Sequence, residues 1–169
     1  MKTYIVLLRA VNVGGTGKLP MTELRAMCGE AGFENVRTYI ASGNVVLDST
    51  STARQVKHTL EASLRSYAGK PVGVLVRTPN EMAAVLAANP FSEAAPNRTV
   101  AIFLDSSPPP DALDTISGCN SEQLALGIRE IYVHYGDGMA DSRLKIPAAK
   151  SGTARNMNTV ARLVAMTAG

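Results

Sequence analysis

The sequence predicts an α+β fold, made of a ferredoxin-like βαββαβ unit followed by a second, incomplete ferredoxin-like βαββα unit. Two observations lead to this prediction. Short apolar runs alternate with stretches of helical periodicity in the order βαββαβ up to about residue 78, and a partial echo of that order begins at residue 99. We therefore expect one compact chain with a first half at residues 1–78, a connecting helix within 79–98 and a second half at 99–169.

The first strand and helix are marked by a change of periodicity. Residues 4–10 are almost all apolar, which is typical of a strand covered on both faces. From Pro20 the apolar residues follow helical spacing, and Gly32 is suited to a left-handed stop. The predicted buried face of this helix consists of Leu24, Met27, Cys28 and Ala31.

A hairpin and a second helix follow. The β-branched runs at 36–41 and 45–48 are separated by Ser42-Gly43-Asn44, a turn-forming tripeptide. An apolar stripe with steps of three and four residues predicts a helix from about residue 53 to 67, and residues 72–77 form a fourth strand. The stripe consists of Ala53, Val56, Leu60, Leu64 and Tyr67.

The second half begins after a strong helix start. Thr78 and Glu81 match a capping box with proline between them, so a third helix is expected before Pro90. Strands are predicted at 99–104, 122–126 and 130–135, with a short helix at 111–116. A last helix is predicted to be capped by Thr153. Its expected apolar face consists of Met157, Val160, Ala161, Val164 and Ala168, with Arg155, Asn158, Thr159 and Arg162 on the polar face.

Charge and cysteine usage limit the class of protein. Residues 139–169 carry five basic residues and one acidic residue, whereas the rest of the chain has 12 basic and 13 acidic residues. This asymmetry favours a local acidic partner over a basic coat for nucleic acid. Two unclustered cysteines argue against a disulfide framework or a zinc site, and no apolar run could span a membrane. We expect a cytoplasmic protein.

A glycine-rich segment at residues 9–18 is the most informative stretch for function. Its glycines would let several backbone N–H groups point at one anion between two cationic side chains. Gly17-Lys18 resembles the end of a phosphate-binding P-loop, but Asn12 and Leu19 stand where that motif needs glycine and a hydroxyl residue. The dinucleotide-binding pattern G-x-G-x-x-G also fails, because Pro20 stands where its third glycine would be. The alternative is a flexible connector with a solvated lysine.

The predicted topology brings this segment to the turn between the second and third strands, because the end of the first strand and that turn share one edge of the sheet. An anion site is therefore expected there. Its residues are Arg9, Asn12, Gly14, Gly15, Gly17, Lys18, Ser42, Gly43 and Asn44.

The start of the last helix is a second candidate anion site, since helix N-termini offer free N–H groups and a positive dipole end. The residues assigned to it are Lys150, Thr153, Arg155 and Asn156. The alternative is an ordinary capped surface helix with solvated side chains. If both groups form one site, the second half has to pack inverted on the first.

The sequence contains no convincing group of catalytic residues. His134 with Asp137 and Asp141 could hold a metal, but three scattered ligands are a weak signal beside a plain strand histidine, so no metal is assigned. Ser42 lacks a nucleophile elbow, and Cys28 lies on a predicted buried face. Whether the chain is an enzyme, and with which cofactor, stays open.

Four segments carry a family resemblance: RAVNVGG at 9–15, LPMTELR at 19–25, GFENVRTYIASGNVV at 32–46 and TARNMNT at 153–159. The chain resembles the bacterial family catalogued as domain of unknown function 1697. The resemblance implies an α+β fold of ferredoxin-like units and a soluble bacterial protein, with no established activity. Tryptophan is common in that family at the position of Met157, where this chain departs from the pattern.

The leading hypothesis is a protein that binds a phosphate-bearing ligand, either a nucleotide or a nucleic-acid segment. The alternatives are a structural or self-associating protein without a catalytic site and a hydrolase built on Ser42 or a metal at His134. The oligomeric state is left open.

Overall fold

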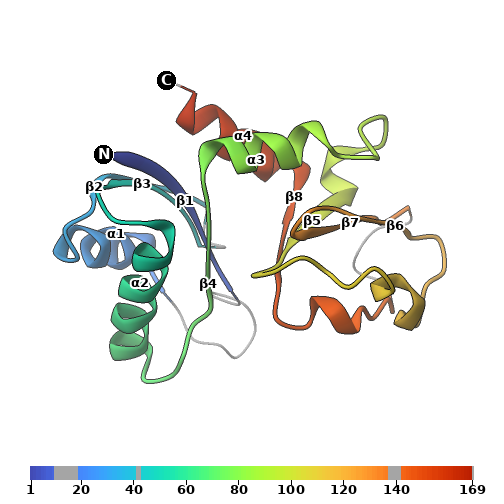
Figure 1. Ribbon diagram of the computed structural model, residues 1–169, viewed down its shortest axis with the longest axis horizontal. Coiled ribbons are helices and arrows are strands. Elements are labelled where there is room, and N and C mark those ends of the chain that lie inside the picture. The colour runs from blue at the N-terminus through green and yellow to red at the C-terminus, as the bar shows by residue number, and fades with distance from the viewer. Residues whose placement is uncertain (10–18, 41–42, 137–141, 169) are drawn as a thin grey trace. The chain divides into compact units, whose positions relative to one another are not determined.

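The computed structural model describes residues 1–9, 19–40, 43–136 and 142–168, which form a mixed α+β fold (Figure 1). The described residues contain two four-stranded antiparallel sheets and four α-helices. The chain divides into a first unit, Met1–Met82 with Leu163–Gly169, and a second unit, Ala83–Arg162.

The first unit has the element order predicted from the sequence. Its elements are β1 (Lys2–Leu8), α1 (Met21–Glu30), β2 (Glu34–Tyr39), β3 (Asn44–Ser49), α2 (Ala53–Ala68) and β4 (Val74–Arg77). The strand order is β2-β3-β1-β4, and every neighbouring pair is antiparallel. β1 therefore lies between β3 and β4, as the predicted topology requires.

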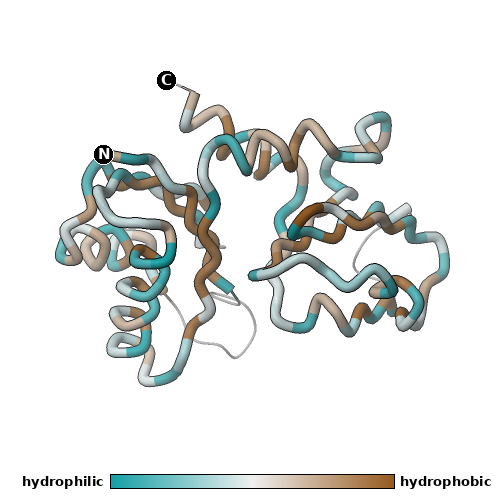
Figure 2. Tube along the Cα trace, in the orientation of Figure 1, coloured by the Kyte–Doolittle hydropathy of each residue, from teal (hydrophilic) through white to brown (hydrophobic). Residues whose placement is uncertain are grey.

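A hydrophobic core joins this sheet to α1 and α2. Leu24 and Cys28 of α1 and Leu60 of α2 pack with Val6 and Val45 of the sheet in one buried cluster. Tyr4–Leu8 is buried along its whole length, which confirms the prediction that both faces of this strand are covered. Brown colouring marks this apolar run along β1 in Figure 2.

Local sequence signals mark the end of α1 and both ends of α2. Thr52 and Gln55 form a capping box at the start of α2, and Gly69 ends that helix with φ +73°. Gly32 follows α1 with φ +91°, as predicted. The predicted stripe on α2 was wrong at Tyr67, which is 46% exposed because it lies in the last turn of the helix.

The second unit contains a sheet with the same pattern of strand order. Helix α3 (Pro79–Ala87) leads into it, and the predicted capping box is confirmed by N–H···O bonds of 2.9 Å and 3.1 Å between Thr78 and Glu81. The strand order is β6-β7-β5-β8, and all pairs are antiparallel. The elements are 3₁₀ helix η2 (Pro96–Arg98), β5 (Thr99–Phe103), 3₁₀ helix η3 (Ala112–Thr115), β6 (Gln123–Leu126), β7 (Glu130–His134), 3₁₀ helix η4 (Pro147–Ala149), β8 (Thr153–Asn156) and α4 (Met157–Thr167).

The prediction of a helix capped by Thr153 was wrong. Residues 153–156 form strand β8, which pairs with β5 from Val100 to Phe103 and gives the second sheet its fourth strand. Helix α4 begins at Met157, and Oδ1 of Asn156 accepts the Thr159 N–H at 2.9 Å. Asn156 is thus the residue that caps α4.

The predicted faces of α4 also need correction. Met157, Val160 and Leu163 are buried, and Thr159, predicted to lie on the polar face, is buried as well. Ala161, predicted to lie on the apolar face, is exposed. Helix α4 starts three residues later than predicted, and its buried face includes Thr159 and Leu163 in place of Ala161.

Candidate anion site at one end of the first sheet

Three segments that are distant in sequence meet at the end of β1. The Leu8 N–H donates to the carbonyl oxygen of Gly43 at 2.8 Å, and the Arg9 N–H donates to that of Gly73 at 2.9 Å. Leu7 is paired with Asn44 in the β1–β3 ladder. These contacts confirm that the end of β1 and the β2–β3 turn share one edge of the sheet.

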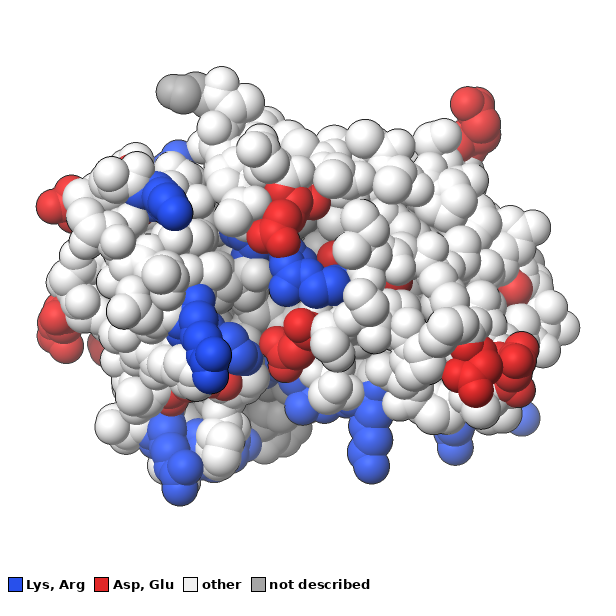
Figure 3. Space-filling model, in the orientation of Figure 1, with Lys and Arg blue, Asp and Glu red and all other residues white. Residues whose placement is uncertain are grey.

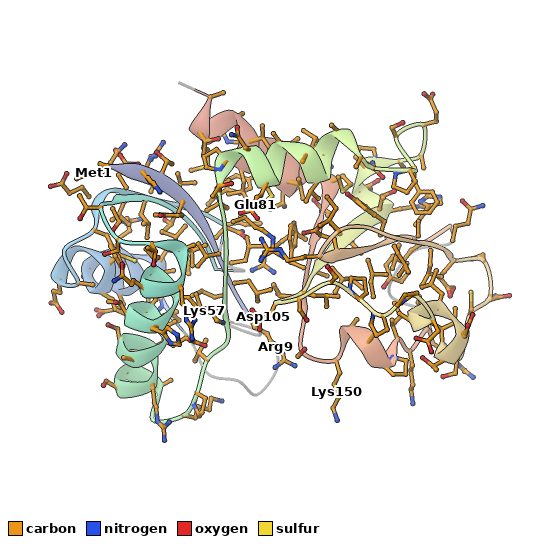
Figure 4. All side chains as sticks on the ribbon, in the orientation of Figure 1. Met1, Arg9, Lys57, Glu81, Asp105 and Lys150 are labelled. Atoms are coloured by element: carbon orange, nitrogen blue, oxygen red, sulfur yellow. The ribbon has the colours of Figure 1, made fainter. Side chains whose placement is uncertain are left out.

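Arg9 is a cationic side chain at this edge. It is exposed and lies beyond the end of β1 (Figure 4). Its side chain runs over Gly73, because a Cβ atom built on Gly73 would be 3.1 Å from Cβ and 3.3 Å from Cδ of Arg9. A guanidinium group presents its N–H donors in a planar fork. Arg9 therefore places a planar guanidinium group at this edge.

The β2–β3 turn is fixed by Gly43 and Asn44. Gly43 has φ +88°, which glycine adopts without steric cost. Asn44 is fully buried, and its Nδ2 donates to the carbonyl oxygen of Tyr39 at 2.9 Å. Its side chain thus closes the turn from inside, so the predicted role of Asn44 as a direct ligand contact needs correction to a positioning role.

The remaining residues predicted for this site lie outside the described part of the chain. They are Asn12, Gly14, Gly15, Gly17, Lys18 and Ser42.

The second predicted group lies in the second unit and has a different structure from the one expected. Arg155 is buried within β8, where Nη1 donates to Oγ1 of Thr153 at 2.7 Å and to the carbonyl oxygen of Ala154 at 2.9 Å. Burial lowers the pKa of Arg155 to about 10. Asn156 is occupied as the helix cap, and only Lys150 of this group is exposed. The predicted helix-start site at Thr153 was therefore wrong, because a strand occupies those residues.

The described side chains that were considered for catalysis, His134 and Cys28, make packing or hydrogen-bond contacts within the fold. His134 Nδ1 lies 3.2 Å from Oγ1 of Thr99, and its ring centroid is 6.0 Å from that of Phe91. Asp137 and Asp141 lie outside the described residues, within which no group of three metal-ligating side chains occurs. Cys28 is fully buried as predicted, and burial raises its pKa to about 11.

Two further residues at this edge have no signal in the sequence. Gly73 matters because the side chain of Arg9, which is distant in sequence, packs where a Cβ atom of residue 73 would be. Ile40 has φ +51° and is exposed. Local sequence patterns could not identify either residue, since both features arise from the sheet.

Basic and acidic side chains are interspersed on the visible surface of each unit, as Figure 3 shows. That distribution does not resemble the broad basic coat typical of non-specific nucleic-acid binding. No helix among the described residues is both long and apolar enough to cross a membrane. The cytoplasmic location stays a prediction.

The two-sheet α+β fold is shared with a bacterial protein of known structure. The chain is similar to a structure described as conserved bacterial protein SP0830 from Streptococcus pneumoniae, with a TM-score of 0.79, 24% sequence identity and 98% of each chain covered. At this identity the likeness establishes the shared fold.

The chain belongs to the family described as Protein of unknown function (DUF1697), whose model matches residues 1–132. The match confirms the resemblance inferred from the sequence. No curated protein is significantly similar to the chain.

Proposed function

We propose that this protein binds a phosphate-bearing ligand, a nucleotide or a nucleic-acid segment, at the end of the first sheet. Arg9 and Lys18 supply positive charge in this proposal. Gly14, Gly15 and Gly17 supply backbone N–H donors, a common way of binding phosphate in glycine-rich segments.

The observation that carries the proposal is that Leu8 is bonded to Gly43 and Arg9 to Gly73 at the point where β1 leads into the glycine-rich segment. Two backbone hydrogen bonds, of 2.8 Å and 2.9 Å, hold the end of β1 to the segments that precede β3 and β4. A cation held by a rigid sheet end loses less entropy on binding than one on a free loop.

The chemistry of the edge suits a phosphate group. A guanidinium group can donate two parallel hydrogen bonds to a phosphate, and such charge-assisted pairs are stronger than neutral ones. Backbone N–H groups of glycine can approach phosphate oxygens closely because no Cβ atom intervenes. The proposal rests on the first unit, since Thr153, Arg155 and Asn156 are engaged in strand β8 and in capping α4.

We also propose that both sheets belong to ferredoxin-like units. The strand orders β2-β3-β1-β4 and β6-β7-β5-β8 with all pairs antiparallel support this. In the second unit, 3₁₀ helices η3 and η4 stand where the first unit has α1 and α2. The similarity therefore concerns the strands more than the helices.

A thermal-shift screen against inorganic phosphate, pyrophosphate, nucleotides, phosphosugars and short oligonucleotides tests the proposal. A ligand that binds the native state raises the melting temperature, by an amount set by the ratio of its concentration to Kd. We expect at least one phosphate compound to raise the melting temperature of the wild type, and Arg9→Ala to reduce that shift.

Arg54→Ala is the matched control, because Arg54 is an exposed arginine on α2 away from this edge. Equal shifts for the Arg9 and Arg54 variants, or no shift with any phosphate compound, would contradict the proposal and leave the structural or self-associating alternative.

A further inference from the structure

Helices α1 and α2 lie side by side on one side of the first sheet (Figure 1). Their buried residues, such as Leu24 and Leu60, pack with Val6 of the sheet in one core cluster. The opposite surface of the two helices, which the sheet does not cover, is formed by the exposed residues of Met21–Glu30 and Ala53–Ala68. We call it the α1–α2 face.

A groove of about 570 Å³ lies between the two helices on this face. Its α1 wall includes Glu23, Met27 and Glu30, and its α2 wall includes Ser63 and Tyr67. Every charged residue that lines the groove is acidic. Tyr67 is 46% exposed there, and tyrosine is enriched at the centres of protein–protein interfaces. The groove therefore combines an exposed aromatic ring with negative charge.

Helix α1 presents an acidic row to this groove. Glu23 and Glu30 are both exposed and are seven residues apart, which places them on one side of the helix about 10 Å from each other. Arg25 lies on another side of α1, because its Nη1 donates to Oγ1 of Thr38 in β2 at 2.8 Å. The charge that α1 contributes to the groove is thus negative.

Helix α2 presents a basic row beside the groove. Arg54 and Arg65 are exposed and are eleven residues, or three turns, apart, so they lie on the same side of the helix. Lys57 and Glu61 pair with each other at 3.4 Å, and Lys57 Nζ also donates to the carbonyl oxygen of Val74 in β4 at 2.6 Å. That pair is neutral and lies towards β4, so the two arginines set the charge of the outer side of α2.

The α1–α2 face is therefore complementary in charge to a second copy of itself. A twofold interface uses the same patch on both copies, so each row on one copy meets the other row on the second copy. When α2 of one copy lies along the groove of the other, its arginines come opposite the acidic row, and the symmetry repeats this contact. The exposed Ala26 and Ala62 allow a close approach, since the distance between packed helices depends on the side chains at the contact.

We propose that the protein forms a twofold symmetric dimer through the α1–α2 face, with α2 of each copy in the groove of the other. A second copy fits this face better than an unrelated basic partner, because the face carries both charges rather than negative charge alone. The inference does not depend on the proposed phosphate site, and the two are tested by separate measurements.

Sedimentation equilibrium of the intact chain at low salt tests the dimer. We expect the mean mass to rise with protein concentration from 17.8 kDa towards twice that value. The dimer should weaken as salt is raised, because exposed charges are screened. The double variant Glu23→Arg with Glu30→Arg makes the face wholly basic, and Arg54→Glu with Arg65→Glu makes it wholly acidic. Each should raise the dimer dissociation constant at least tenfold, since like charges then face each other.

Mixing the two double variants is the decisive step. In a mixed dimer the basic rows of one variant face the acidic rows of the other at both symmetry-related contacts, so association should return. A change that only unfolds the protein or alters its net charge would not be rescued in this way. Glu30→Arg alone provides a milder variant if a double variant does not fold, because a cation suits the C-terminal end of α1.

Glu93→Arg with Asp114→Arg is the matched control, because it makes the same change of charge at two exposed acidic residues of the second unit. This control should dimerise like the wild type. A wild type that stays monomeric at every concentration at low salt would overturn the proposal. A dimer that persists in both double variants, or a mixture of the two folded variants that stays monomeric, would overturn it as well.

Discussion

A backbone hydrogen bond connects Arg9 to Gly73, and the side chain of Arg9 packs closely over Gly73. The Arg9 N–H donates to the Gly73 carbonyl oxygen at 2.9 Å, and the Arg9 side chain occupies the space that a Cβ atom on residue 73 would need. The absence of a side chain at Gly73 therefore allows Arg9 to lie where it does. This relationship links the start of β4 to a cationic side chain at the end of β1.

Gly73→Ala should displace the Arg9 side chain, because the new Cβ would lie 3.1 Å from Cβ of Arg9. We expect the free energy of unfolding to fall by about 1 kcal/mol, as overpacking usually costs. Phosphate affinity should fall as well, since the guanidinium group moves. Chemical denaturation and calorimetry measure the two effects.

Gly29→Ala is the matched control for that variant. A Cβ on Gly29 meets nothing within 4 Å, and the residue lies in α1. Alanine there should stabilise the protein by about 0.5–1 kcal/mol and leave phosphate affinity unchanged. Destabilisation by Gly29→Ala as large as that by Gly73→Ala would refute the steric explanation.

Asn44→Ala should destabilise the protein by about 1–3 kcal/mol, because the carbonyl oxygen of Tyr39 loses a buried donor. The β2–β3 turn should loosen, so hydrogen exchange of the Leu8 amide, which is bonded to Gly43, should accelerate. Unchanged exchange at Leu8 would show that Asn44 does not control this turn.

Asn156→Ala should lower the free energy of unfolding by about 1 kcal/mol, since it removes the acceptor for the Thr159 N–H at the start of α4. Asn158→Ala is the control, because Asn158 is an exposed residue within the same helix. Denaturant titration of both variants measures the difference. Equal stabilities would show that the cap is not at Asn156.

Cys28 should resist thiol reagents in the native protein. It is fully buried, and its pKa is raised from 9.0 to about 11, so almost no thiolate forms at pH 8. In a Cys119→Ser background, which removes the exposed cysteine, a disulfide reagent should react only after denaturant is added. Rapid reaction of the native variant would contradict the buried position.

The same shift predicts a pH dependence of stability. The folded-state pKa is the higher one, so the contribution of Cys28 is complete below pH 9 and is lost as the pH rises towards 11. The free energy of unfolding, compared between the parent and Cys28→Ala, should show a difference that shrinks by about 2–3 kcal/mol over this range. A constant difference would rule out the shift.

The sequence predicts the first unit well because its signals are local. The stripe of Val56, Leu60 and Leu64, the stop at Gly32 and the turn at Gly43 each follow from a few neighbouring residues. The predicted meeting of the end of β1 with the β2–β3 turn then follows from topology, and the Leu8–Gly43 hydrogen bond confirms it.

The end of the chain was predicted less well because tertiary pairing overrides local preference there. Thr153 followed by apolar residues at helical spacing resembles a capped helix, yet residues 153–156 pair with β5. That pairing buries Arg155 and moves the cap to Asn156. The strain at Ile40 and the space at Gly73 were also inaccessible to sequence patterns, since both depend on neighbouring strands.

The central claim, a phosphate site organised by Arg9, is tested most directly by calorimetric titration of pyrophosphate into the wild type and Arg9→Ala at two salt concentrations. The account predicts binding that weakens as salt rises and that falls at least tenfold in Arg9→Ala, as expected when a charge-assisted pair is lost. Equal binding by the two proteins, or no binding at low salt, would contradict it.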